Sequence, residues 1–134
     1  MSRIRHEVTR THTKIREGGH PRFLAPELLD DPREFLTTTP SDVYSLALTF
    51  LNLVTLETPF SQYTRDFAAA SAAQRGERPH KPDNPRFFTL DVLHSLWGLF
   101  EDMWARDPFA RPDAECVADR LQTILKPLDS GNVQ

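Results

Sequence analysis

The sequence predicts an all-α protein built around one central buried helix. The strongest observation is the stretch from Ser41 to Leu56, where apolar residues recur at helical spacing and cover nearly the whole circumference. Such a helix belongs in a core, because one buried face would leave the other in water. Two more stretches, 90–104 and 113–126, have an apolar face at the same spacing, and no segment has a convincing strand pattern. We therefore expect about five helices in one domain.

The central helix has predicted limits at both ends. Pro40 stops any preceding helix, and the side chain of Ser41 or Asp42 can cap the free amide groups. The helix is expected to end near Glu57-Thr58-Pro59, because proline cannot continue it. At roughly 16 residues it is too short to span a bilayer, which needs about 20 apolar residues.

Two shorter helices are predicted from their end signals. Pro26 suits the first turn of a helix, since a proline there sacrifices no hydrogen bond, and Asp30-Asp31-Pro32 ends this segment. The alanine-rich stretch from Asp66 to Ala73 favours a helix that packs closely, and Gly76 closes it.

Two longer helices follow. The first begins at Thr89 or Asp91 and stops at Asp107-Pro108. The second is capped by Asp113 and is expected to end at Lys126-Pro127, where proline again interrupts the pattern.

Composition places the chain among ordinary globular proteins. It has 134 residues, 39% hydrophobic and 26% charged, with a net charge of −3. A single cysteine, Cys116, excludes an internal disulfide. The N-terminus has no apolar core, so we expect no signal peptide and place the protein in the cytoplasm; the sequence does not exclude the nucleus.

The first 22 residues are basic, with six Lys and Arg residues against two Glu residues. Such a segment can contact nucleic acid, anionic lipid or phosphate. No aromatic residue is interleaved before Phe23, so stacking on bases is poorly supported. We expect no nucleic-acid partner and no membrane contact. One interpretation of residues 1–20 is a disordered leader.

Four motifs occur in one order along the chain. They are Gly-His-Pro-Arg-Phe-Leu-Ala-Pro-Glu at 19–27, Ser-Asp-Val-Tyr-Ser-Leu-Ala at 41–47, Arg-Gly-Glu-Arg-Pro at 75–79 and Trp-Ala-Arg-Asp-Pro-Phe-Ala-Arg-Pro at 104–112. Together they resemble the C-terminal half of a eukaryotic protein kinase domain, nearest to serine/threonine kinases of the tyrosine-kinase-like group. The resemblance covers 19–125 and implies the C-terminal (large) lobe portion of the protein kinase-like fold, with ATP-dependent phosphorylation of protein Ser/Thr as the parent activity.

The resemblance implies mainly structural roles for individual residues. Glu27 would pair with Arg111 and so tie the end of the activation segment to the loop before the last helix. Asp42 would accept hydrogen bonds from the catalytic-loop backbone of an intact kinase. Trp104 resembles a packing residue.

The resemblance also divides the chain and assigns its N-terminal part. Residues 1–18 would be an activation-segment remnant, 19–128 a partial kinase domain and 129–134 a frayed tail. Candidate phosphosites in the remnant are Thr9, Thr11 and Thr13. The segment that contacts the protein substrate would comprise His20, Pro21, Arg22, Phe23 and Leu24, although the family usually has threonine where His20 stands.

Phosphoryl transfer needs parts that these residues do not contain. The sequence has no glycine-rich phosphate loop, no Val-Ala-Ile-Lys-like strand and no His-Arg-Asp triplet. We expect the chain alone to be inactive, with no cofactor; ATP and magnesium belong to an intact parent kinase. The histidines and Cys116 are not at metal-ligand spacing, so we expect no metal site.

Two hypotheses on function remain open. The chain is either part of a kinase that acts on a protein substrate, or a stand-alone kinase-like module that engages a kinase or its substrate. In the kinase family the activation segment begins at an Asp-Phe-Gly triplet. The helix and the catalytic loop that precede this triplet normally cover part of the central helix. Without them we expect an exposed apolar surface that promotes self-association.

Overall fold

The computed structural model describes residues 21–30, 37–83 and 89–132, with side chains up to Lys126 in the last helix. These residues form five α-helices and two short 3-10 helices, and they contain no strand, so the predicted all-α class is confirmed. The elements are η1 (Pro21–Phe23), α2 (Pro26–Asp30), α3 (Thr39–Thr55), α4 (Asp66–Gln74), α5 (Leu90–Met103), η3 (Pro108–Ala110) and α6 (Ala114–Asn132).

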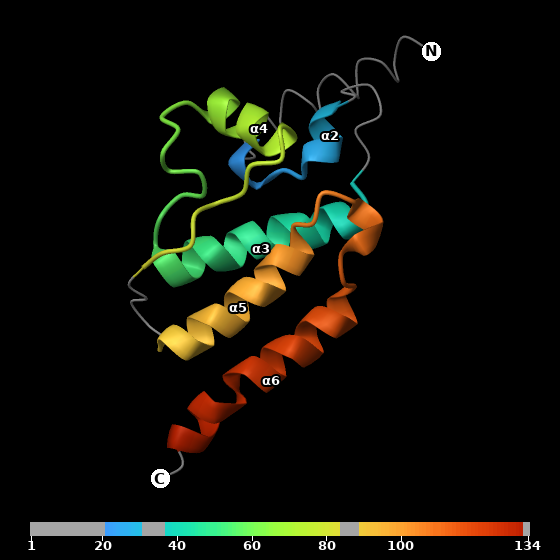
Figure 1. Ribbon diagram of the computed structural model, residues 1–134. Coiled ribbons are helices and arrows are strands. Elements are labelled where there is room, and N and C mark those ends of the chain that lie inside the picture. The colour runs from blue at the N-terminus through green and yellow to red at the C-terminus, as the bar shows by residue number, and fades with distance from the viewer. Residues whose placement is uncertain (1–20, 31–36, 84–88, 133–134) are drawn as a thin grey trace.

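Helix α3 occupies the middle of the fold (Figure 1). Helices α2 and α4 lie together on one side of it with η1, α5 crosses its other side, and α6 packs beyond α5. The hydrophobic core forms where these elements meet, and its largest fully buried side chains are Tyr44, Leu48, Phe60, Leu93, Leu99, Phe100 and Met103.

The start of α3 differs from the prediction. Thr38, rather than Ser41 or Asp42, is the N-cap. The Ser41 amide donates to Thr38 Oγ1 at 3.2 Å, and the Thr38 amide donates to Ser41 Oγ at 2.8 Å. This reciprocal capping box places Pro40 inside the first turn, where its missing N–H would have had no helical partner.

The end of α3 is also set differently. The helix ends at Thr55, and Leu56 adopts a left-handed conformation with φ of 58°. The Leu56 amide donates to the Asn52 carbonyl at 2.8 Å. A left-handed residue in this position is a common helix end, so Pro59 is not what ends α3.

Helix α3 is buried on one side and partly uncovered on another, in keeping with the expected exposed apolar surface. One face is buried, comprising Val43, Tyr44, Ala47, Leu48 and Leu51. The neighbouring face is only half-buried at Phe50 and Val54, and Leu53 is 62% exposed. Helix α3 is therefore central in the fold while one apolar side of it still reaches the surface.

Several of the other predicted helix ends are confirmed, but α5 ends at Met103 rather than at Asp107-Pro108. Helix α4 is followed by Gly76, whose φ of 98° favours glycine. The Thr89 side chain caps α5 by accepting from the Val92 amide at 3.2 Å. Asp113 Oδ1 accepts from the Cys116 amide at 2.8 Å at the start of α6.

The predicted end of α6 is wrong. The helix continues through Pro127 to Asn132. Proline removes one backbone hydrogen bond, but its fixed φ is compatible with a helix, so an end at Lys126-Pro127 is not obligatory. None of the described helices is long and apolar enough to cross a membrane.

We predict that Leu56→Gly stabilises the protein. Leu56 is 60% exposed and left-handed, a conformation that costs an L-residue roughly 1–2 kcal/mol and glycine nothing. After the greater flexibility of glycine in the unfolded chain is subtracted, the free energy of unfolding should rise by about 0.5–1 kcal/mol. Urea denaturation measures it. The matched control Leu53→Gly, at similar exposure inside the helix, should lose about 1 kcal/mol, and a loss in both variants would contradict the prediction.

Candidate functional site

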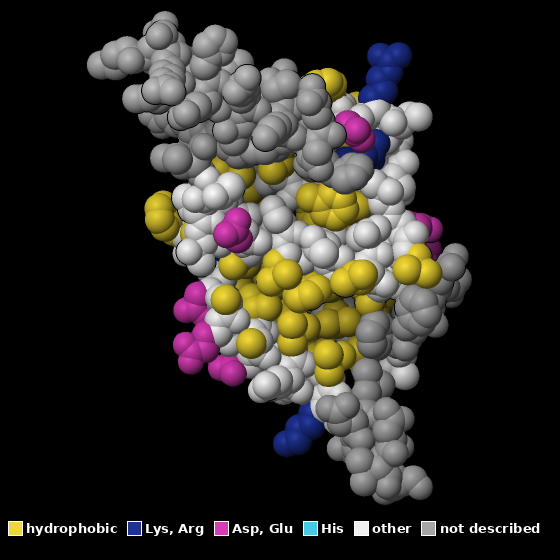
Figure 2. Space-filling model, turned by 180° about the vertical axis from the view of Figure 1, so that it is seen from behind, with side chains coloured by type: hydrophobic (Ala, Val, Ile, Leu, Met, Phe, Trp, Pro, Cys, Tyr) yellow, Lys and Arg dark blue, Asp and Glu magenta, His cyan; other side chains and the backbone are white. Residues whose placement is uncertain are grey.

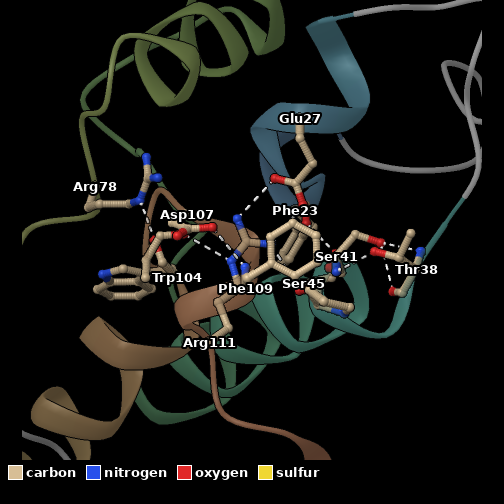
Figure 3. Close-up of polar contacts among 12 residues, drawn as sticks. Phe23, Glu27, Thr38, Ser41, Ser45, Arg78, Trp104, Asp107, Phe109 and Arg111 are labelled. Carbon is tan, nitrogen blue, oxygen red and sulfur yellow. Dashed lines mark hydrogen bonds and ion pairs between the residues drawn. The ribbon is translucent and has the colours of Figure 1, made fainter.

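Arg111 lies at the junction of the segments that the sequence motifs identify. Its Nη1 donates to Glu27 Oε2 at 2.7 Å and its Nη2 donates to Glu27 Oε1 at 2.9 Å, so the pair is bidentate. The Arg111 side chain is fully buried and that of Glu27 is 28% exposed. Figure 3 shows Arg111 reaching from the loop before α6 to Glu27 on α2. The ion pair implied by the kinase resemblance is thus present.

The Arg111 guanidinium also holds two other segments. Its Nε donates to the Ala105 carbonyl at 2.9 Å, and its Nη1 donates to the Pro40 carbonyl at 2.9 Å in the first turn of α3. The guanidinium therefore joins α2, the start of α3 and the loop between α5 and η3. These segments are distant in sequence, so one buried cation determines how they meet.

Tyr44 is a part of this site that sequence reasoning did not assign. The guanidinium carbons of Arg111 and Arg78 lie 5.1 Å and 5.3 Å from the centre of its ring, within cation–π distance. Arg78 belongs to the Arg-Gly-Glu-Arg-Pro motif, and its Nε donates to the Trp104 carbonyl at 2.9 Å. The only sign of this contact in the sequence was that both arginines belong to the four motifs.

The Tyr44 hydroxyl is buried and has no hydrogen-bond partner among the described residues. Burial raises the pKa of Tyr44 to about 12, although the charges of Arg78 and Arg111 act in the opposite direction. Burial also lowers the pKa of the Arg78 guanidinium. Both pKa shifts favour the neutral form of the side chain, as expected for a group removed from water.

Arg22 lies in the proposed substrate-contacting segment, but its side chain points into the protein. Its Nε donates to Asp66 Oδ1 at 2.7 Å, and its Nη1 donates to the Pro59 and Phe60 carbonyls at 3.1 and 2.8 Å. Its Nη2 donates to the Tyr63 carbonyl. The residue is buried, so its guanidinium fastens η1 to the 59–63 turn and to the start of α4. This internal role was not predicted.

The remaining candidate residues have different surroundings. Phe23 and Leu24 pack half-buried against the core, and the Phe23 carbonyl accepts from Ser45 Oγ at 2.7 Å. Trp104 is buried and packs edge-on against Trp97, with ring centres 5.2 Å apart. Asp42 is exposed in the first turn of α3.

Some expectations stay untested by the structure. His20 and the threonines Thr9, Thr11 and Thr13 lie outside the described residues. Contact between Pro21–Leu24 and a substrate also remains a prediction. Among the described residues, no group of three or more His, Cys, Asp or Glu side chains is placed to hold a metal ion.

An apolar groove opens on the face opposite to the view of Figure 1. Figure 2 shows the hydrophobic side chains gathered there. The groove has a volume of about 270 Å³ and lies between α3, α5 and α6. Its lining comprises Phe50, Leu53 and Val54 of α3, Leu96 and Phe100 of α5, and Leu121 and Leu125 of α6. The expected exposed apolar surface is therefore present.

No protein-family model matches the chain. Individual proteins do match it. Anti-Muellerian hormone type-2 receptor of Homo sapiens is 33% identical over 87% of this chain, and serine/threonine-protein kinase STY17 of Arabidopsis thaliana is 30% identical over 82%. Dual specificity protein kinase shkC of Dictyostelium discoideum is 29% identical over 80%. The chain spans only 24%, 18% and 19% of the lengths of these three relatives.

We predict that Glu27→Ala destabilises the protein strongly, because it leaves the buried Arg111 charge without its counter-ion. The free energy of unfolding should fall by about 3 kcal/mol or more, measured by urea denaturation. The matched control is Asp102→Ala, which breaks an exposed ion pair with Arg120 at 2.7 Å and should cost less than about 1 kcal/mol. Equal losses in the two variants would contradict a special role for the buried pair.

We predict that the free energy of unfolding falls between pH 10 and about pH 12 because of Tyr44. The folded pKa lies above the unfolded value, so the unfolded chain releases the proton first and stability drops as the pH rises. The loss should be on the order of 2 kcal/mol. Tyr44→Phe should remove most of this decline while changing stability little at pH 7, since no hydrogen bond is lost. If the free energy of unfolding of Tyr44→Phe declines as steeply with pH as that of the unmodified protein, Tyr44 is not the group responsible.

Several observations agree at this point. The four motifs occur in the same order as in the kinase family, and the helices pack around α3 with Glu27 bound to Arg111. The relatives that match most of the chain include proteins named as serine/threonine and dual specificity protein kinases. The chain belongs to the protein kinase family and corresponds to part of the C-terminal lobe of the kinase domain.

Proposed function

We propose that these residues form the part of a serine/threonine kinase domain that contacts the protein substrate. The activity of the intact parent domain would be ATP-dependent phosphorylation of protein Ser/Thr in the cytoplasm. The observation that supports this most directly is the Glu27–Arg111 pair. It holds the segment ending at Glu27 against the lobe, and the Arg22 contacts hold the preceding residues in the same way. A segment fixed at both points is suited to presenting a peptide substrate in one orientation.

We further propose that these 134 residues alone neither bind ATP nor transfer phosphate. Catalysis of phosphoryl transfer depends on positioning and on charge stabilisation by a phosphate loop, a lysine, a catalytic aspartate and magnesium ligands. The sequence contains none of the motifs that supply them. ATP and magnesium would be bound by other residues of an intact parent domain.

A second candidate is a kinase-like binding module that engages a kinase or its substrate. The open apolar groove between α3, α5 and α6 favours it, because exposed apolar surfaces of this kind mark interaction sites. The genomic sequence upstream of the Met1 codon separates the two candidates. An open frame encoding His-Arg-Asp and Asp-Phe-Gly supports the kinase, and an in-frame stop codon directly upstream supports the module.

We predict no thermal stabilisation of the purified chain by Mg-ATP. A ligand present at 100 times its Kd stabilises a protein by about 2.7 kcal/mol, which raises the melting temperature by several degrees in a domain of this size. Differential scanning fluorimetry with millimolar Mg-ATP would detect such a shift, with Mg-GTP and magnesium alone as controls. A shift that is specific for Mg-ATP and saturates with concentration would overturn the proposed inactivity.

A further inference from the structure

The turn from Pro59 to Tyr63 holds the segment that is proposed to contact the protein substrate. Its backbone carbonyls at 59, 60 and 63 accept hydrogen bonds from the buried Arg22 guanidinium. The Tyr63 amide donates to the Phe60 carbonyl at 2.9 Å and closes the turn. Phe60 is left-handed, with φ of 59°, and a residue in such a conformation stays there only when its surroundings hold it. The position of Arg22 therefore depends on what fixes this turn.

A contact at the surface fixes the end of the turn. The Tyr63 hydroxyl donates to the Glu77 carboxylate and lies 2.9 and 2.8 Å from its two oxygens. Arg75 Nη2 donates to Glu77 Oε2 at 2.9 Å, so the carboxylate has a second partner. The hydrogen bond between the two side chains lowers the pKa of Glu77 and raises the pKa of Tyr63. Both shifts favour a carboxylate that accepts from a neutral phenol.

Glu77 belongs to a part of the fold that is built without Arg22. Its amide donates to the Ala72 carbonyl at 3.0 Å, directly after Gly76 ends α4. The next residue, Arg78, fastens the same loop to the end of α5, because its Nε donates to the Trp104 carbonyl at 2.9 Å (Figure 3). The contact with Tyr63 therefore ties the turn to a separately anchored loop.

We propose that Glu77 is a positioning residue for the segment Pro21–Leu24: it holds the Tyr63 side chain, and the Tyr63 carbonyl then holds Arg22. One tyrosine thus carries the connection, through its hydroxyl at the surface and its carbonyl toward the interior. The consequence for substrate contact rests on the proposed function. The coupling between Glu77 and Arg22 does not.

Trypsin cleavage of the full chain after Arg22 measures how often this segment is released. The bond between Arg22 and Phe23 can be cut only when the buried arginine leaves its site, so the rate follows the population of the released form. Glu77→Ala and Tyr63→Phe should each increase the rate at which the fragment beginning at Phe23 appears by about fivefold, measured by mass spectrometry. Cleavage after Arg120, inside α6, reports global unfolding and should not change.

Further variants separate positioning through Tyr63 from a general loss of stability. Glu77→Ala combined with Tyr63→Phe should be cleaved no faster than either single variant, because both substitutions remove the same contact. Glu77→Gln keeps an acceptor for the hydroxyl and should restore most of the slow cleavage. The matched control Asp102→Ala breaks an exposed ion pair with Arg120 at 2.7 Å and should leave cleavage after Arg22 unchanged.

Three results would overturn the proposal. They are an unchanged rate after Arg22 in Glu77→Ala, additive effects in the double variant, and an equal rise in cleavage after Arg120. The assay needs neither ATP nor a substrate, so none of these results bears on the proposed kinase function. That function fails separately, if an in-frame stop codon lies directly upstream of the Met1 codon, and the coupling between Glu77 and Arg22 would then stand without a role in substrate contact.

Discussion

The buried guanidinium of Arg111 is the constraint on which the rest of the structure depends. Removing a cation from water costs several kcal/mol, so it is tolerated only where nearly every donor finds a partner. Here the donors reach Glu27 on α2, the Pro40 carbonyl at the start of α3 and the Ala105 carbonyl after α5. Because the three acceptors come from different parts of the chain, the cation is satisfied only when these segments are correctly placed. Hydrophobic packing alone is non-directional and would not select this arrangement.

Arg22 is a second buried arginine that joins segments distant in sequence. Its contacts with Asp66 and with the backbone of the 59–63 turn fasten η1 to the segment that enters α4. Phe60 in this turn has a φ of 59°, which is unfavourable for a side chain of its size, and its carbonyl is one of the acceptors. The hydrogen bond from Arg22 therefore helps to hold a strained backbone in place. The two buried arginines give a mainly apolar helical lobe its directional contacts.

Helix α3 combines two environments that matter for function. The face that carries Tyr44 and Leu48 lies in the core, and α3 contacts η1, η3 and α5. The face that carries Leu53 lies in the apolar groove at the surface. In the proposed kinase, the first face supports the substrate segment, and the second is the face that the family's helix before Asp-Phe-Gly would cover. One helix would thus link the two surfaces rigidly, because both are built on the same backbone.

The sequence by itself determined the all-α class, the approximate position of each described α-helix, several caps and the kinase motifs, since these depend on local periodicity and on neighbouring residues. It also implied the Glu27–Arg111 pair through the family resemblance. Only the tertiary structure decided that Arg22 points inward and that Tyr44 lies within cation–π distance of two arginines. It also decided which apolar face of α3 is covered, because the sequence contains apolar residues on all sides and only the packing of η1, η3 and α5 distinguishes them. Burial and charge pairing depend on residues far apart in the chain, and no local pattern carries that information.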